Sequence, residues 1–234
     1  MKTRLIFVRH AEATGNVNRV FNGWTDGLLT EKGHKQAQKV ADRLSDTPID
    51  VIYSSSLTRT LQTASYISDK KGLPINKKDG LKEINGGDWE GKLWEELASI
   101  WPHENDTWEN RPHEHQMPNG ESMAGFEKRL HESVDEIVHE NEGKNILIVT
   151  HGTAIRAMMC KFYGLGLEAM IDIQWYDNTS VTIVDYENGK YTVVLEGDNS
   201  HLGSELGTVE NQDWWEDYKK TFEERRRKRM EAKK

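Results

Sequence analysis

Short apolar runs, each closed by polar residues, alternate along the chain with segments in which apolar residues recur at helical spacing. The runs are Leu5–Val8, Val51–Tyr53 and Asn145–Thr150. Their length and their β-branched residues are typical of buried strands. Helices are expected in the segments with helical spacing, at about residues 30–44, 57–71, 121–141 and 152–163.

Two further apolar runs, at 181–185 and 191–195, flank the dipeptide Asn188-Gly189. This dipeptide is a strong turn signal and predicts a β-hairpin. Strands that alternate with helices favour a parallel sheet covered by helices on both faces. We therefore expect an α/β fold with three α/β/α layers, a mostly parallel central sheet and an antiparallel hairpin at one edge.

The segment before the third strand departs from this alternation. A helix-like piece is expected at about 92–100, and residues 102–120, which hold three of the five prolines, are predicted to be loop. We expect an inserted helical flap at about 88–120 that lies over one end of the sheet. Most of its tryptophans are expected to pack the flap onto the domain, with one or two lining a pocket: Trp89, Trp94, Trp101 and Trp108.

The C-terminal part of the chain has a different pattern. Trp215, Tyr218 and Phe222 form an apolar stripe at helical spacing, and residues 225–229 are all basic. The sequence thus predicts one domain at 1–203, which includes the flap, and a charged helical tail at 204–234. The stripe is expected to dock the tail on its own domain or on a second copy, so a monomer or a homodimer is expected.

Composition narrows the class of protein. The chain has 234 residues, of which 35% are hydrophobic and 30% charged, and its formal net charge is −8, which argues against a general nucleic-acid binder. No apolar run approaches membrane-spanning length, and the N-terminal residues lack the apolar core of a signal peptide. The single cysteine, Cys160, cannot form an internal disulfide. A cytoplasmic protein without a membrane or nucleic-acid partner is expected.

Charged side chains follow several of the expected strands. Arg9 and His10 follow the first strand, His151 follows the run at 145–150, and Arg59 and Glu83 lie in the segments after other strands. The carboxyl ends of parallel strands meet at one edge of a sheet, so these residues are expected to gather there. Two arginines and two histidines in one place favour an anion site, because a buried polar cluster is costly without a compensating ligand.

These residues carry a resemblance to a known family. Residues 9–12 (Arg-His-Ala-Glu), with Asn16, resemble the Arg-His-Gly signature of the histidine phosphatase superfamily, whose namesakes are the cofactor-dependent phosphoglycerate mutases. Ala11 stands where the signature usually has glycine, which removes no chemical group. Further segments resemble the family's other motifs in the same order, so that the likeness spans about residues 3–203: residues 53–64, 83–91, 149–152 and 199–202.

The resemblance implies roles for three catalytic residues. His10 is implied as the nucleophile that attacks phosphorus and forms a phosphohistidine. Glu83 is implied as the acid that protonates the leaving oxygen and then takes a proton from water, which requires a raised pKa. His151 is implied to donate to the phosphate oxygens as charge shifts in the transition state.

Four residues are expected to bind the phosphate. The resemblance implies that Arg9 and Arg59 clamp its oxygens and that Asn16 makes a further contact. Gly152 begins the helix after His151, and free N–H groups at a helix start are donors for phosphate oxygens.

The resemblance leaves phosphatase and mutase open. Asn22 and Gly23 begin a segment, residues 22–26, that resembles a substrate loop of the mutases. The segment between Glu83 and His151 looks shorter than in true mutases, however, and a shorter flap lets water reach the phosphohistidine. We therefore expect a metal-independent phosphomonoesterase for a small phosphorylated metabolite, with phosphoglycerate mutase as the alternative within the family.

Two alternatives lie outside this chemistry. The flap holds His103, His113 and His115 beside Glu104 and Glu114, which could ligate a metal, but their spacing matches no helical zinc motif. No metal and no cofactor are therefore expected. The chain could also be a non-catalytic module that binds a phosphorylated ligand, because a fold alone does not guarantee chemistry.

Overall fold

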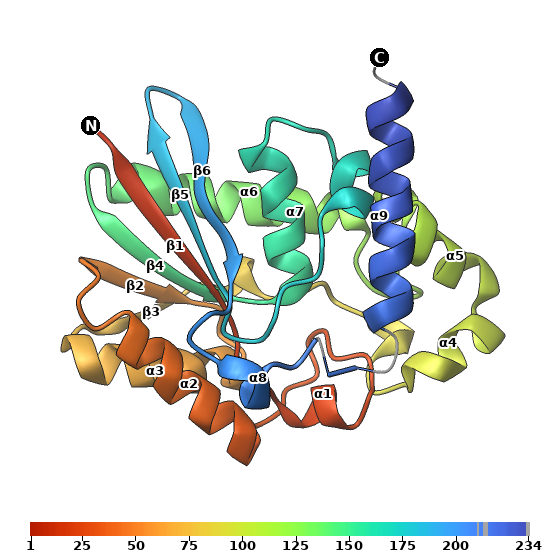
Figure 1. Ribbon diagram of the computed structural model, residues 1–234, viewed down its shortest axis with the longest axis horizontal. Helices are drawn as coiled ribbons and strands as arrows, with labels where there is room; N and C mark the ends of the chain where they lie inside the picture. The colour runs from red at the N-terminus through yellow and green to blue at the C-terminus, as the bar shows by residue number, and fades with distance from the viewer. Residues whose placement is uncertain (210, 213–214, 233–234) are drawn as a thin grey trace.

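The central feature of the fold is a six-stranded sheet in the order β3-β2-β4-β1-β5-β6 (Figure 1). The structure is a computed structural model that describes residues 1–209, 211–212 and 215–232. The strands are β1 (Thr3–Arg9), β2 (Val51–Ser54), β3 (Ile75–Lys77), β4 (Asn145–Thr150), β5 (Val181–Glu187) and β6 (Lys190–Asp198).

Strand direction divides the sheet into two parts. β3, β2, β4 and β1 are parallel neighbours, and β5 and β6 add an antiparallel hairpin beside β1. Arg9 at the end of β1 pairs with Thr150 at the end of β4, and Ser54 at the end of β2 pairs with Val149. The ends of three strands therefore meet at one edge, and the expected α/β fold with a mostly parallel sheet is confirmed.

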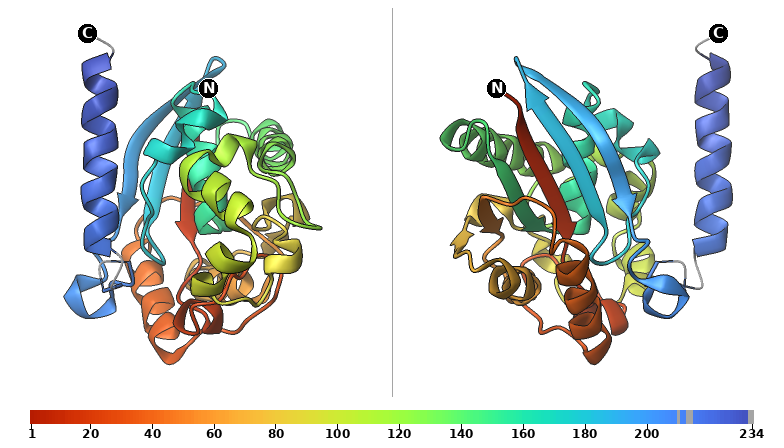
Figure 2. Two further views of the ribbon diagram at one scale, coloured as in Figure 1. Left: turned by 90° about the vertical axis from the view of Figure 1, so that its right-hand side faces the viewer. Right: turned by 60° about the vertical axis from the view of Figure 1, so that its left-hand side comes forward.

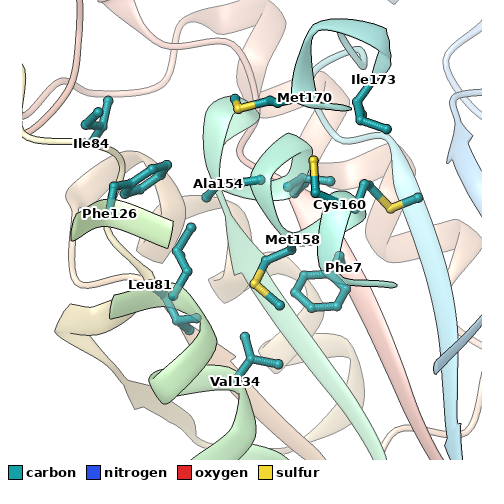
Figure 3. Close-up of a cluster of buried hydrophobic side chains, with 14 of the residues drawn as sticks. Phe7, Leu81, Ile84, Phe126, Val134, Ala154, Met158, Cys160, Met170 and Ile173 are labelled. Atoms are coloured by element: carbon teal, nitrogen blue, oxygen red, sulfur yellow. The ribbon is translucent and has the colours of Figure 1, made fainter. Parts of the chain in front are cut away.

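Helices cover both faces of the sheet (Figure 1). Helices α2 (Glu31–Arg43) and α3 (Thr58–Lys71) pack on the face that buries Ile6 and Val8. Helices α6 (Met123–Glu140) and α7 (Gly152–Phe162) pack on the opposite face, which buries Leu5 and Phe7. Side chains alternate between the two faces of a strand, so β1 contributes to both cores. Figure 3 shows the second core, in which Met158 of α7 lies near Phe7.

The inserted flap is more helical than the sequence predicts. Helix α4 (Trp94–Ile100) matches the expected helical piece, but α5 (Pro102–Asn110) and the 3-10 turn η3 (Pro112–Glu114) occupy much of the predicted loop. Pro102 is in the first turn of α5, where proline's missing N–H costs no hydrogen bond. The proline therefore begins a helix here, and the loop expected at 102–110 is wrong.

Aromatic side chains hold the flap together. Trp89 is fully buried, and its ring lies 5.9 Å from Trp108 and 5.3 Å from His115 (centroid to centroid). His115 is also buried, with Nδ1 at 2.9 Å from Thr107 Oγ1, so its ring is part of the flap core. Among the residues that the structure describes, no three His, Cys, Asp or Glu side chains are grouped so that they could hold a metal ion.

Short elements lie in the connections between the larger ones. They are α1 (Thr14–Val17), the 3-10 turns η1 (Asp79–Leu81), η2 (Gly87–Trp89) and η4 (Leu167–Asp172), and α8 (Gly203–Leu206). The last helix, α9 (Trp215–Ala232), lies at the periphery and contacts η4 (Figures 1 and 2).

The aromatic stripe of α9 is partly covered. The rings of Trp215 and Tyr218 stack at 5.5 Å between centroids, those of Tyr218 and Phe222 at 5.8 Å, and all three side chains are half-buried. Within the basic segment 225–229, all side chains except that of Arg227 lie outside the described residues. None of the described helices has the length and apolar character needed to cross a membrane.

Candidate active site

His10 immediately follows β1 and is held through both its ring and its backbone. Its Nδ1 lies 2.8 Å from the Ala11 carbonyl oxygen, and Asn178 Nδ2 donates to the His10 carbonyl at 2.8 Å. Because a carbonyl oxygen can only accept, Nδ1 carries the hydrogen and Nε2 keeps its lone pair. Burial, then the positive charges of Arg59 and Arg9, hold the pKa of His10 well below its usual value. The imidazole is therefore neutral, and its free nitrogen can act as a nucleophile.

His151 lies beside His10 at the end of β4. The two ring centroids are 5.3 Å apart, and His151 Nε2 lies 2.9 Å from Ser55 Oγ in the loop after β2. The buried Nδ1 has no hydrogen-bond partner among the described residues. Burial and the charge of Arg59 also lower the pKa of His151 well below its usual value. A ligand oxygen that accepted a hydrogen bond from this ring would satisfy a buried polar group.

Arg59, in the first turn of α3, is fully buried. Its Nη1 donates to the Thr25 carbonyl at 3.0 Å, and its Nη2 donates to the carbonyls of Asn22 at 3.1 Å and Gly23 at 2.7 Å. Burial lowers the pKa of Arg59 to about 10, against the opposing effect of the Glu83 carboxylate. The guanidinium is therefore still charged at neutral pH, and it is fixed in position by three carbonyl groups.

Arg9 supplies a second guanidinium at the end of β1, which is half-buried with its Nε covered by protein. Its Nη1 donates to the Tyr176 carbonyl. Burial lowers the pKa of Arg9, and the carboxylates of Asp177 and Glu83 oppose that shift. A Cβ atom on Gly152 would lie 3.3 Å from Arg9 Nε and 3.4 Å from Cζ. The glycine therefore lets the start of α7 approach the guanidinium, so that helix N–H groups and Arg9 can face one anion.

Glu83 is buried at the start of α7. Its Oε1 accepts a hydrogen bond from Ile84 N at 2.9 Å, and its Oε2 accepts one from Thr153 N at 3.1 Å. Burial raises the pKa of Glu83, whereas these two backbone hydrogen bonds and the charge of Arg59 oppose the rise. Burial is the larger effect, so the carboxyl group holds its proton to higher pH than an exposed glutamate does.

The loop at 22–26 is part of the support for Arg59. The carbonyls of Asn22 and Gly23 accept from Arg59, and Gly23 N donates to Glu90 Oε2 at 3.2 Å. A Cβ atom on Gly23 would lie only 2.3 Å from the Ile84 carbonyl oxygen, so glycine is required by the close packing. The described contacts of Asn22 and Gly23 are thus with the protein, and a role in binding substrate remains a prediction.

Asp177 and Asn178, which precede β5, were not expected from the sequence. Asn178 holds the backbone of His10, and Asp177 Oδ1 accepts hydrogen bonds from Thr208 N at 2.7 Å and Val209 N at 2.6 Å. Both side chains are buried. A polar run directly before a buried strand is the available signal, but it does not distinguish such a site from an ordinary loop.

A cavity of about 460 Å³ adjoins the site at Arg9 and Asn16. The Oδ1 atom of Asn16 accepts from Ala13 N at 3.0 Å, and within the part of the chain that the structure describes its amide NH₂ donates to no protein group. Trp94 and Trp108 are the flap tryptophans that line the cavity. The other lining residues are Gly15, Arg19, Val20, Glu95, Asn105, Glu109, Pro112, Arg156, Ile171, Trp175, Thr208, Val209, Gln212 and Tyr218.

The structure therefore brings five side chains into one group, which we call the polar cluster: the half-buried Arg9 and the buried His10, Arg59, Glu83 and His151. The charges of the two guanidinium groups help to lower the pKa of both histidines, and the Glu83 carboxylate opposes the lowering of the pKa of both arginines by burial. These mutual effects show that the five side chains share one electrostatic environment. A neutral nucleophile between two fixed cations, with a buried carboxyl group nearby, suits chemistry on a phosphate ester.

Comparisons with known proteins agree with this geometry. The chain is 34% identical over 200 residues to a protein named phosphoserine phosphatase 1 from Hydrogenobacter thermophilus, which covers 86% of this chain and 94% of that protein. It is 33% identical over 208 residues to a protein named probable phosphoglycerate mutase GpmB from Yersinia pestis, which covers 85% of this chain and 94% of the relative.

A solved structure has the same fold. The structure described as Bacillus stearothermophilus YhfR superposes with a TM-score of 0.82 at 36% identity, covering 85% of this chain and 98% of that chain. The model of the histidine phosphatase superfamily (branch 1) matches residues 5–199. The chain therefore belongs to branch 1 of the histidine phosphatase superfamily.

Proposed function

We propose that this protein is a metal-independent phosphomonoesterase that hydrolyses a small phosphorylated metabolite through a phosphohistidine on His10. The observation that carries the proposal is the state of the His10 ring. Its Nδ1 is held by the Ala11 carbonyl, and its pKa is lowered by burial and by Arg59 and Arg9. A neutral imidazole beside two guanidinium groups is both a nucleophile and a neighbour of a phosphate site.

In the first step, His10 Nε2 attacks the phosphorus atom in line with the ester oxygen. The N–P bond forms as the P–O bond breaks, and Glu83 gives its proton to the departing alkoxide oxygen. The raised pKa of Glu83 supports this role, because a general acid has to be protonated at the working pH. The products of this step are the free alcohol and a phosphoryl group on His10.

In the second step, water attacks the phosphoryl group. Glu83, now ionised, takes a proton from that water as the N–P bond breaks. Inorganic phosphate leaves, and both His10 and Glu83 return to their starting protonation states. The same carboxyl group thus serves as acid and then as base, which balances the protons over one turnover.

The remaining groups stabilise the charge of the transferring phosphoryl group. Arg9 and Arg59 hold its equatorial oxygens, and His151 donates to one of them. Asn16 and the N–H groups at the start of α7, including Gly152, add neutral donors. Fixed donors of this kind stabilise the transition state without having to reorganise during the reaction. Asn22 and Gly23 keep Arg59 in position through their carbonyl groups.

Phosphoglycerate mutase is the second candidate. The relative named probable phosphoglycerate mutase GpmB supports it, as does the loop at 22–26 held by Arg59. The similarity to phosphoserine phosphatase 1 favours hydrolysis. A non-catalytic binding module is the candidate of another class, and the presence of all five residues of the polar cluster argues against it.

We also infer the domain bounds, the cellular location and the oligomeric state of the protein. We assign catalysis to residues 1–203, with the flap at about 88–120, and we treat residues 204–234 as a separate tail. A cytoplasmic location fits the single cysteine, Cys160, which is buried. We expect a monomer or a homodimer that acts on a freely diffusing phosphate ester.

The test is phosphate release from 4-nitrophenyl phosphate in the presence of a strong chelator. The parent protein is expected to turn over, and His10→Ala is expected to lose at least about 10³-fold in kcat, because the nucleophile is removed. Activity that vanished in the chelator and returned with a metal ion would overturn the metal-independent mechanism. Tight binding of the ester without turnover would point to the binding module.

A further inference from the structure

The cavity beside the polar cluster offers space for the alcohol part of a substrate, and this inference rests on the proposed phosphatase function. The cavity begins at Arg9 and Asn16, where the phosphate is expected, and extends to Tyr218 of α9. Its walls combine the rings of Trp94, Trp108 and Trp175 with several charged side chains. The cavity wall therefore offers contacts beyond those that would bind a phosphate group.

Arg156 is the buried charge in the wall of this cavity, with 8% of its surface exposed. It lies on α7 four residues after Gly152, so the two residues share one face of the helix. A helix rises about 1.5 Å per residue, which places Arg156 one turn, about 6 Å, beyond the phosphate end of α7. A small molecule with two acidic groups can span such a separation.

The guanidinium of Arg156 is held firmly. Its Nε donates to the Ile173 carbonyl at 2.9 Å, and its Nη2 donates to the Met170 carbonyl at 2.9 Å. Its Cζ lies 4.2 Å from the centre of the Trp175 ring. These contacts fix the plane of the group but use only part of its donor capacity, since arginine has five N–H bonds.

The charge of Arg156 lacks a close anion. Among the described residues no ion pair to Arg156 is found, and its two side-chain hydrogen bonds go to neutral backbone carbonyls. Burial lowers the pKa of Arg156, and nearby groups that favour its charged form only partly oppose this shift. A buried cation without an anion is costly, and an acidic group on a ligand would offset that cost.

The C-terminal segment forms part of the wall of this cavity. Thr208, Val209, Gln212 and Tyr218 line the cavity, and all four lie beyond residue 199, where the match to the family ends. Side chains that cover part of a cavity displace water from it, and a charge interaction there is stronger than one at an open surface. The tail thus contributes to the place where Arg156 would meet a ligand.

We propose that Arg156 is a specificity-determining residue that binds a second acidic group, a carboxylate or a second phosphate, on the alcohol part of the substrate. In this assignment the polar cluster holds the phosphate to be removed, and Arg156 selects esters whose leaving group carries its own negative charge. The competing explanation is that Arg156 only fastens η4 through the carbonyl groups of Met170 and Ile173. That role would give no preference between charged and uncharged leaving groups.

The test compares two phosphonates that differ in one charge, 4-phosphonobutyrate and butylphosphonate, by calorimetric binding at neutral pH. We expect the parent protein to bind 4-phosphonobutyrate at least about tenfold more tightly, a gain typical of one charge-assisted contact. In Arg156→Gln both ligands should bind equally, with the Kd of butylphosphonate within about threefold of the parent value. Arg156→Lys keeps the charge and should retain part of the preference.

Arg4→Gln is the matched control, because Arg4 pairs with Asp185 at the opposite end of β1. It should leave the preference unchanged. A parent protein that does not discriminate, or an Arg156→Gln variant that keeps the full preference, would overturn the proposal. The affinities of butane-1,4-diphosphonate and 4-phosphonobutyrate, each relative to that of butylphosphonate, show whether a second phosphate or a carboxylate is the preferred group. Because binding of phosphonates needs no turnover, failure of the proposed hydrolysis would be seen separately with 4-nitrophenyl phosphate.

Discussion

Burial shifts the pKa values of the catalytic acid and the nucleophile in opposite directions. It raises the pKa of the Glu83 carboxyl group and lowers the pKa of the His10 imidazole, so both groups favour their neutral forms. A neutral acid and a neutral nucleophile are the states that the first step needs. The sequence could name these residues through the resemblance, but only the packed structure shows the burial that prepares them.

Replacement of Glu83 tests its role as the acid. Glu83→Gln should reduce kcat/KM for an alkyl ester such as glycerol 3-phosphate by about 10²- to 10⁴-fold, because an alkoxide leaves poorly without a proton. The loss for 4-nitrophenyl phosphate should be much smaller, since nitrophenolate leaves without help. Equal losses for both esters would contradict the assignment.

The pH profile gives a second test of the same residue. The first step requires protonated Glu83, so kcat/KM for the alkyl ester should be highest at acidic to neutral pH and should fall as pH rises through the raised pKa of Glu83. Stopped assays across the pH range measure this fall. A rate that stays constant well above neutral pH would show that another group supplies the proton.

At the scale of elements, helix α7 joins most of the site together. It begins at Gly152, and its Thr153 N donates a hydrogen bond to the Glu83 carboxyl group. Arg156, which lines the cavity, follows about one turn later. The apolar run before it and the His-Gly pair made this helix predictable. The flap was less predictable, because a proline such as Pro102 can either break a helix or begin one, and the sequence alone does not decide.

Gly152→Ala tests how closely α7 approaches the site. The added Cβ would lie 3.2 Å from Trp175 Cζ3 and 3.3 Å from Arg9 Nε, so one of these groups has to shift. We expect kcat/KM for 4-nitrophenyl phosphate to fall at least about tenfold, because a small displacement of a phosphate-binding group is costly. Steady-state kinetics and a thermal unfolding scan together check this. An unchanged kcat/KM in a folded variant would mean that neither group needs its present position.

At the scale of the whole molecule, the fold keeps several buried or half-buried histidines neutral. Burial lowers the pKa of His115 and of His201 to about 4, and it lowers those of His10 and His151 well below the usual value. The arrangement of the strands and helices in layers was predictable from their alternation along the chain. Contacts such as Asp177 with the 208–209 backbone were not, because they join segments that no local pattern connects.

These histidines predict how stability depends on pH. In the unfolded chain they take up protons near pH 6.5, whereas in the folded chain His115 and His201 resist protonation down to about pH 4, and the pKa values of His10 and His151 also lie well below 6.5. The unfolded state therefore binds more protons in this window, and the free energy of unfolding should fall as pH decreases from about 6.5 to 4. Each such histidine contributes a slope of about 1.4 kcal/mol per pH unit. Urea denaturation at several pH values measures this slope, and a flat profile would contradict the neutral, buried state.

The covalent phosphoryl group on His10 is the central claim, and trapping it is the most direct test. Glu83→Gln should be mixed with 4-nitrophenyl phosphate, since this ester needs no acid to react and the intermediate then lacks the base for its hydrolysis. After an alkaline quench and digestion, mass spectrometry should find one phosphoryl group on the peptide that contains His10, stable in alkali and lost in acid. A second substitution, His10→Asn, should abolish the label. A label on another residue, or turnover of the parent protein without any covalent intermediate, would contradict the mechanism.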